Sequence, residues 1–106
     1  VIMKTISVEE LKAKFDNSEN FQLVDIREEY ELELACIGGD HIPMGEVRNN
    51  LGKIRKDIPV IIHCRGGKRS GNMVVFLSDN GYDNLYSLEG GINAWSERID
   101  SSMNVY

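Results

Sequence analysis

An unbroken apolar run, PVIIHC at residues 59–64, constrains the fold of this chain more than any other feature. A strand with one face in water alternates apolar and polar side chains, whereas a strand of a parallel sheet is buried on both faces and reads as a continuous apolar run. The segment therefore predicts a central strand of a parallel sheet that is covered on both sides.

Short β-like runs and helical segments alternate along the rest of the chain. Strands are expected at 4–7, 21–26, 59–64 and 84–88, with a brief strand at 41–42. Helices are expected after a Ser7/Glu10 capping box and at 28–35, 45–55, 70–80 and 90–99. This alternation predicts an α/β fold with a mostly parallel sheet. Because 106 residues is a usual size for one domain, we expect residues 1–106 to form a single domain.

Charge and composition exclude several classes of partner. The net charge of −5 argues against a chain shaped for nucleic acid or for an anionic membrane. No apolar run approaches the roughly 18 residues needed to span a bilayer, and the first residues show no signal peptide. Two cysteines do not make a disulfide framework, so we expect a cytoplasmic protein with free thiols.

Cys64 ends the apolar run, and a cationic, glycine-rich loop follows it. Ligands of parallel sheets bind at the carboxyl ends of the strands, which is where Cys64 is expected. The cations are Arg65, Lys68 and Arg69. Gly66 and Gly67 let several backbone N–H groups turn towards one anion. A helix is expected to begin near Ser70. Nearby cations and a helix N-terminus favour the ionised thiolate. The loop therefore predicts a nucleophilic thiolate in an anion cradle.

Two chemistries use a cysteine in such a loop: phosphoryl transfer through a cysteinyl phosphate and sulfur transfer through a persulfide. The spacing separates them, because four residues lie between Cys64 and Arg69. A phosphatase loop of the tyrosine type has five, and the position that would carry its arginine is Ser70. The shorter loop favours sulfur transfer and leaves a small cysteine phosphatase as the less favoured alternative.

Four segments together resemble one known family. They are LVDIRE at 23–28, DHIPMGEV at 40–47, CRGGKRS at 64–70 and LEGGINAW at 88–95. These resemble the Asp-x-Arg, Gly-His-Ile-Pro-Gly-Ala, Cys-Arg-Ser-Gly-x-Arg-Ser and Leu-x-Gly-Gly-x-x-x-Trp segments of single-domain rhodaneses, which are sulfurtransferases. They occur in the family's order and span nearly the whole chain.

The resemblance implies a sheet of about five strands, flanked by helices, and a catalytic Cys64 that carries a persulfide. The backbone N–H groups of residues 65–69 would stabilise the outer sulfur, and the three cations would attract a small anionic donor such as thiosulfate. The sulfur would pass to a thiol or protein acceptor, and no cofactor is implied. Because Gly66 stands where the family has serine, two alternatives stay open: a partner-dependent persulfide carrier and a non-catalytic binding module.

Several other residues carry expectations that the structure can test. Asp25 and Arg27 are expected to form a local ion pair that supports the active loop, residues 64–70. The segment REEYELE at 27–33 is expected to be a solvated helix face. Cys36 is expected to be a buried structural thiol.

The two histidines are assigned supporting rather than catalytic parts. We expect His63 to pack behind the loop, because its side chain alternates with that of Cys64 along a strand. We expect His41 to make a structural hydrogen bond. The histidines and cysteines lack zinc-ligand spacing, so no metal site is predicted.

Overall fold

The computed structural model describes residues 4–103 and has five parallel strands in one sheet, in the order β1-β5-β4-β2-β3. The strands are β1 (Thr5–Ile6), β2 (Gln22–Asp25), β3 (Asp40–His41), β4 (Val60–His63) and β5 (Leu85–Leu88). The α-helices are α1 (Val8–Asp16), α2 (Glu29–Leu34), α3 (Lys68–Asp79) and α4 (Gly91–Arg98). The predicted α/β fold, with a five-stranded parallel sheet flanked by helices, is confirmed.

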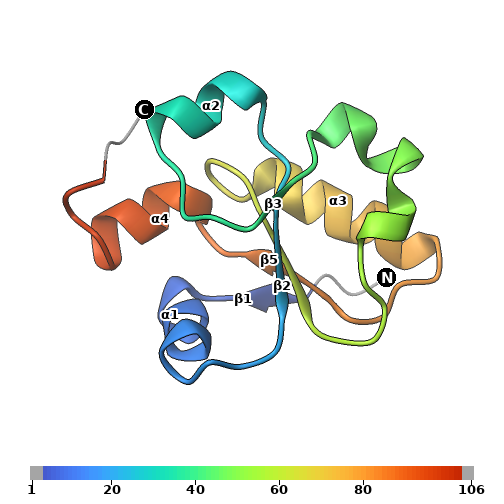
Figure 1. Ribbon diagram of the computed structural model, residues 1–106, viewed down its shortest axis with the longest axis horizontal. Coiled ribbons are helices and arrows are strands. Elements are labelled where there is room, and N and C mark those ends of the chain that lie inside the picture. Colours follow the sequence, from blue (N-terminus) through green and yellow to red (C-terminus); the bar gives the residue numbers. More distant parts are fainter. Residues whose placement is uncertain (1–3, 104–106) are drawn as a thin grey trace.

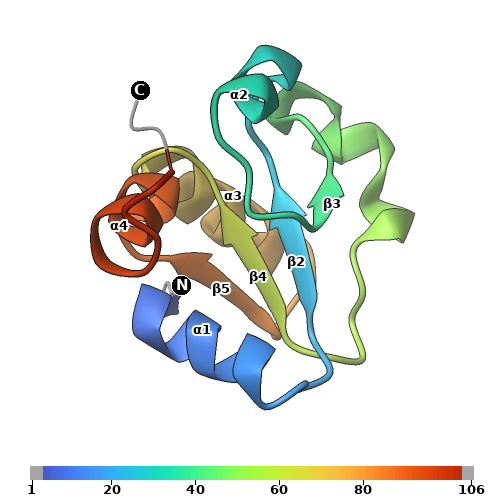
Figure 2. The same cartoon turned by 60° about the vertical axis from the view of Figure 1, so that its left-hand side comes forward.

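Helices cover both faces of the sheet (Figures 1 and 2). Figure 2 shows β5, β4, β2 and β3 side by side, with α1 and α4 in front of the sheet and α3 behind it. Ile61 of β4 packs into a core cluster with Val8 and Leu11 of α1, whereas Ile62 packs into a second cluster with Val74 and other residues of α3. Successive side chains of β4 thus enter opposite cores, which is the physical reason for its unbroken apolar sequence.

The capping box predicted at the start of α1 is present. The Ser7 Oγ accepts a hydrogen bond from the Glu10 backbone N–H at 3.1 Å, and the Glu10 carboxylate accepts one from the Ser7 N–H at 3.1 Å. The hydrogen bonds from Ser7 lower the pKa of Glu10. Both N–H groups would otherwise lack an intrahelical partner, so the box fixes where the helix begins.

The helix predicted at 45–55 is the one element of the wrong type. The structure has two short 3₁₀ helices instead, η1 (Met44–Asn49) and η2 (Leu51–Lys53). The side chain of Asn50 donates to the backbone carbonyl of Glu46 at 2.8 Å, and such side-chain bonds compete with a continuous helical ladder. Val47, Leu51 and Ile54 recur at helical spacing in this segment, and Val47 and Ile54 are buried while Leu51 is partly buried. The core needs their apolar side chains rather than a particular helix type.

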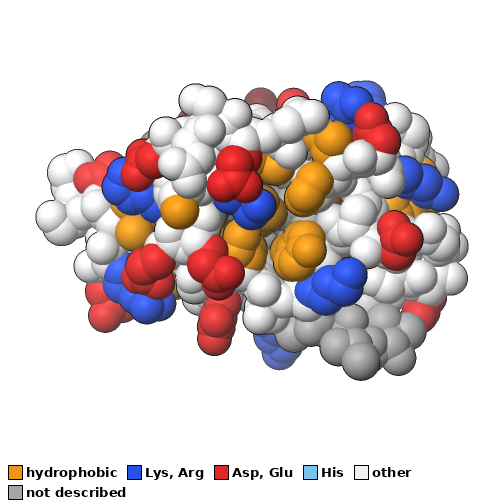
Figure 3. Space-filling model, turned by 90° about the horizontal axis from the view of Figure 1, so that it is seen from below, with side chains coloured by type: hydrophobic (Ala, Val, Ile, Leu, Met, Phe, Trp, Pro, Cys, Tyr) orange, Lys and Arg blue, Asp and Glu red, His pale blue; other side chains and the backbone are white. Residues whose placement is uncertain are grey.

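The face seen from below is mixed in character. Apolar side chains gather near its middle, and acidic and basic side chains surround them (Figure 3). Within residues 4–103, no helix is long and apolar enough to cross a membrane.

Candidate active site

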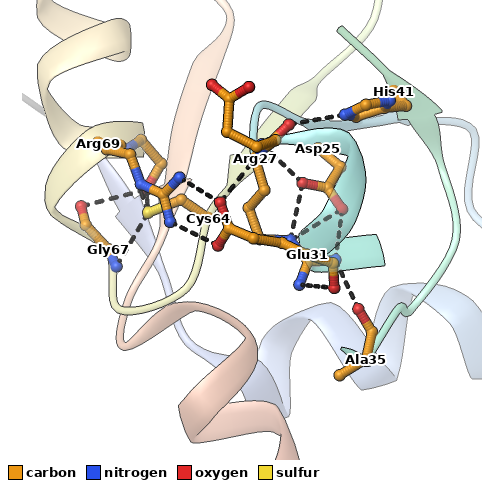
Figure 4. Close-up of polar contacts among 10 residues, drawn as sticks. Asp25, Arg27, Glu31, Ala35, His41, Cys64, Gly67 and Arg69 are labelled. Carbon is orange, nitrogen blue, oxygen red and sulfur yellow. Dashed lines mark hydrogen bonds and ion pairs between the residues drawn. The ribbon is translucent and has the colours of Figure 1, made fainter. Parts of the chain in front are cut away.

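Cys64 lies directly after β4 with its side chain only 1% exposed. Its Sγ accepts hydrogen bonds from the backbone N–H groups of Gly67, at 3.1 Å, and Ser70, at 3.4 Å (Figure 4). Helix α3 begins at Lys68, two residues earlier than predicted, so both donors belong to its N-terminal end. The N–H groups at the positive end of the helix dipole therefore face the sulfur.

Of the two loop glycines, Gly67 is required by the backbone and Gly66 is not. Gly67 has φ +104°, in the left-handed region, and a Cβ there would lie 3.3 Å from the Gly90 nitrogen. This backbone conformation and close approach are what glycine permits. Gly66 has no neighbour within 4 Å of such a Cβ and no left-handed φ, so neither crowding nor backbone strain requires glycine there.

The N-terminal end of α4 fixes the same loop from the other side. The N–H of Ile92 donates to the Cys64 carbonyl at 2.9 Å, and the N–H of Asn93 donates to the Arg65 carbonyl at 3.0 Å. Gly91 makes this contact possible, because a Cβ at that position would lie 2.5 Å from the Cys64 carbonyl oxygen. The second glycine of the LEGG segment is therefore needed for the active loop to dock on α4.

A pair of buried hydroxyls lies behind the sulfur. The thiol of Cys64 donates towards the Ser70 Oγ at 3.6 Å, and Ser70 Oγ lies 2.7 Å from the Ser87 Oγ of β5. Ser70 also donates to the Gly67 carbonyl at 3.1 Å. Since a hydroxyl has a single proton, Ser70 can turn that proton to the sulfur when the thiol ionises, while Ser87 donates to Ser70. Ser87 was missed from the sequence; its only local signal is a small polar residue within an otherwise apolar strand.

Asp25 and Arg27 form a fully buried ion pair below the site. The Arg27 Nη2 lies 2.7 Å from the Asp25 Oδ2, and the Nε lies 3.0 Å from the Oδ1. Arg27 also donates to the carbonyls of Glu31, at 3.3 Å, and Ala35, at 2.8 Å, so it ties the end of β2 to α2. Burial is the largest single effect on the pKa of Asp25 and raises it, but the opposing effects, led by the side-chain hydrogen bonds from Arg27, together hold that pKa below its usual value.

The prediction that REEYELE at 27–33 is a solvated helix face holds for most of the segment but is wrong at Arg27 and Glu31. Those two side chains are buried, whereas Glu28, Glu29, Tyr30 and Glu33 are exposed. Glu31 is only 3% exposed, and its two oxygens accept hydrogen bonds from the terminal nitrogens of Arg69 at 2.7 and 2.9 Å. Its carboxylate also caps α2 by accepting the Glu28 N–H at 3.1 Å. Arg69 thus forms a bidentate ion pair with Glu31, while the side chains of Arg65 and Lys68 are exposed. Glu31 was missed because the run contains several glutamates that look alike in sequence.

Both histidines lie outside the reacting position. His63 is buried, neither ring nitrogen has a hydrogen-bond partner, and its Nε2 lies 3.8 Å from the Asp25 Oδ2. Burial lowers the pKa of His63 to about 4, against a partial opposing effect of Asp25, so the ring is neutral at pH 7. The His41 Nε2 lies 2.6 Å from the Arg27 carbonyl oxygen, in a structural hydrogen bond.

Cys36 is exposed, so the prediction of a buried structural thiol is wrong. It follows α2 at the surface, where the chain enters the Gly38–Gly39 turn, and its Sγ accepts the Gly38 N–H at 3.3 Å. Among residues 4–103, no three His, Cys, Asp or Glu side chains lie together in a way that could hold a metal ion.

A second hollow, of about 490 Å³, lies at the opposite, amino-terminal edge of the sheet, between the end of α1 and the starts of β2 and β3. Several polar groups on its wall bind one another: Gln22 donates to Asp40 at 2.8 Å, and Lys14 donates to Glu19 at 3.2 Å. These groups are therefore paired without a ligand.

Comparison with known proteins identifies relatives in sequence and in fold. The sequence model of the rhodanese-like domain matches residues 7–98. A sulfurtransferase of Allochromatium vinosum is 33% identical over 96 residues, which cover 90% of each chain. A thiosulfate sulfurtransferase of Shewanella oneidensis is 30% identical over 95 residues, which cover 89% of this chain and 93% of the relative. The crystal structure of a rhodanese-like domain protein from Staphylococcus aureus superposes with a TM-score of 0.82 at 34% identity, covering 98% of this chain and 99% of the other.

Proposed function

The chain belongs to the rhodanese-like family, and from that premise we propose that it is a sulfurtransferase that carries sulfane sulfur on Cys64. The observation that carries the proposal is the setting of the Cys64 Sγ. It accepts two backbone N–H groups at the N-terminal end of α3 and lies at the base of a loop with exposed cations. In the proposed reaction Cys64 acts as the thiolate, which is the reactive form of cysteine.

The proposed reaction has two displacements. In the first, the Cys64 thiolate attacks the outer sulfur of thiosulfate; the sulfur–sulfur bond of the donor breaks, and sulfite leaves with the electron pair. In the second, an acceptor such as cyanide or a thiolate attacks the outer sulfur of the resulting persulfide, and the Cys64 thiolate leaves. The charge of the persulfide and of the departing sulfite develops beside the N–H groups of Gly67 and Ser70, which are already oriented.

The proposed parts of the other loop residues follow from their places. The exposed side chains of Arg65 and Lys68 are available to attract an anionic donor. The Asp25–Arg27 pair and Ser70 have supporting parts in this proposal, because Arg27 binds the carbonyls of Glu31 and Ala35 and the Ser70 Oγ binds the Gly67 carbonyl.

Intact-mass measurement tests the proposal. We expect the protein to gain the mass of one sulfur atom on incubation with thiosulfate and to lose it on addition of cyanide. The Cys64→Ser variant should show no gain, and Cys36→Ser should behave like the unaltered chain, because Cys36 lies on a separate surface loop. A Cys64→Ser variant that still gained sulfur, or that kept thiosulfate:cyanide activity, would refute the assignment.

The absence of a side-chain hydroxyl at Gly66 leaves a second candidate, in which the physiological donor or acceptor is a protein rather than thiosulfate. A partner would have to present its sulfur on a slender, extended segment to reach a sulfur atom that is 1% exposed. If a persulfide-bearing protein loads Cys64 much faster than thiosulfate at equal concentration, the chain is a partner-dependent carrier. If thiosulfate is the faster donor, the carrier role is rejected.

A further inference from the structure

The active loop is joined to α2 by one buried carboxylate. Figure 4 shows Glu31 of α2 directed at the guanidinium group of Arg69, with both carboxylate oxygens engaged. The residues lie 38 positions apart in the sequence. The Glu31 carboxylate also accepts the N–H of Glu28, so its position is set by its own helix. Arg69 is therefore held from outside the loop that contains it.

This ion pair changes the charge that the loop presents. The loop has three cations, Arg65, Lys68 and Arg69, and the charge of Glu31 opposes that of Arg69. A reagent that approaches Cys64 thus meets a less positive field than it would meet without the Glu31 carboxylate. The effect is strong because Glu31 is buried, where solvent screens its charge less than at the surface.

Stability alone explains such a pair poorly. Removing the Glu31 carboxylate from water costs about as much as its attraction to the partly exposed Arg69 guanidinium returns, so the pair adds little net stability. A bidentate arginine–carboxylate contact does fix the orientation of both groups. The firm consequences of Glu31 are therefore geometric and electrostatic.

We infer that Glu31 is a positioning residue that sets charge selectivity at Cys64: it holds Arg69 and lowers the positive potential, so that donors with little negative charge, such as alkyl hydropersulfides, are favoured relative to dianionic thiosulfate. This inference rests on the proposed function for its meaning in catalysis. The electrostatic part does not depend on sulfur transfer and can be measured separately.

A pair of alkylating reagents measures the field directly. Iodoacetate and iodoacetamide have nearly the same shape and react at the same sulfur, but only iodoacetate carries a negative charge. In a Cys36→Ser background, the ratio of their rates at Cys64 reports the local potential. We expect Glu31→Gln to raise the iodoacetate:iodoacetamide ratio about three- to tenfold, the effect of removing one charge through a partly screened distance.

Three further variants separate charge from structure. Glu33→Gln removes the same charge from an exposed site on the same helix, so its ratio should change less than about twofold. Arg69→Gln should lower the ratio, and the double variant Glu31→Gln/Arg69→Gln should return to within about twofold of the starting value, because the net charge is restored. Glu31→Asp keeps the charge and should keep the ratio even if the shorter side chain slows both reactions.

Thiosulfate kinetics connect the field to catalysis. In Glu31→Gln, the KM for thiosulfate should fall with little change in kcat, and the gain should shrink as salt is added. An unchanged alkylation ratio in Glu31→Gln, or an equal change in Glu33→Gln, would overturn the inference. If no variant turns over thiosulfate, the proposed function fails on its own, while the alkylation ratio still decides the role of Glu31.

Discussion

Replacing Gly91 with alanine should detach the active loop from α4 while leaving every residue of that loop unchanged. The φ of Gly91 is +57°, and a Cβ there would lie 2.5 Å from the Cys64 carbonyl oxygen and 2.6 Å from the Arg65 carbonyl oxygen. Both are backbone atoms, so no side chain can move aside to relieve the overlap. The substitution must shift either the loop or the first turn of α4.

The contacts of Gly91 set the size of the effect. An alanine in the left-handed region costs about 1 kcal/mol. Separation of the two backbones also weakens the hydrogen bonds from Ile92 and Asn93 to the loop carbonyls, at about 1 kcal/mol each. Residual crowding adds about 1 kcal/mol. The total, about 4 kcal/mol, is a large part of the 5–15 kcal/mol that stabilises a typical domain.

Urea unfolding, followed by circular dichroism, measures this loss, and the rate of Cys64 alkylation reports the loop. Gly38→Ala is the matched control, because Gly38 has φ +92° but no atom within 4 Å of a Cβ, so it should lose only about 1 kcal/mol. We expect Gly91→Ala to slow alkylation as well, since the loop that orients Cys64 is displaced. Equal losses in the two variants would refute the reasoning, because backbone strain alone would then account for both.

Three other substitutions test the buried polar groups. The pKa of His63 is about 4 in the folded chain against 6.5 when exposed, so the unfolded chain binds a proton first as the pH falls. The free energy of unfolding should therefore drop by about 3 kcal/mol between pH 6.5 and pH 4. Urea unfolding at a series of pH values measures this drop, and His63→Leu should remove it. Arg27→Met should cost about 3–5 kcal/mol in urea unfolding, since it leaves Asp25 buried without its cation, and a loss under 1 kcal/mol would contradict the ion pair's importance. Ser87→Ala should slow Cys64 alkylation about two- to fivefold, because the Ser70 hydroxyl loses its partner. Ser96→Ala removes a buried hydroxyl elsewhere and should leave the rate unchanged. Equal rates in the two variants would exclude a role for the Ser70–Ser87 hydroxyl pair.

The fold was predictable because its signals are local. The apolar run at 59–64 marks a strand covered on both faces, and the Ser7/Glu10 pair marks the start of a helix through bonds within four residues. The segment 45–55 shows the limit of such signals. Its apolar spacing correctly places Val47 and Ile54 in the core, but two 3₁₀ helices present those residues as well as one α-helix would.

Predictions at single side chains failed where burial depends on packing with distant elements. Cys36 follows an apolar segment yet lies at the surface, because the chain leaves α2 there for a turn. Glu31 lies among acidic residues yet is buried, because Arg27 binds its carbonyl from below and Arg69 binds its carboxylate from the active loop. Composition of the local segment does not distinguish these two cases.

The sequence by itself determined the strand that leads into Cys64 and the kinds of residue in the loop from Cys64 to Ser70, because the sulfur, the cations, the glycines and the helix start lie within seven consecutive residues. Tertiary structure alone decided which charges and hydroxyls reach that loop. Ser87 arrives from β5 and Glu31 from α2, and each contact exists only because the parallel sheet brings the carboxyl ends of separate strands to one edge. The spacing of residues along the sequence does not reveal such contacts, because they depend on how whole helices and strands pack.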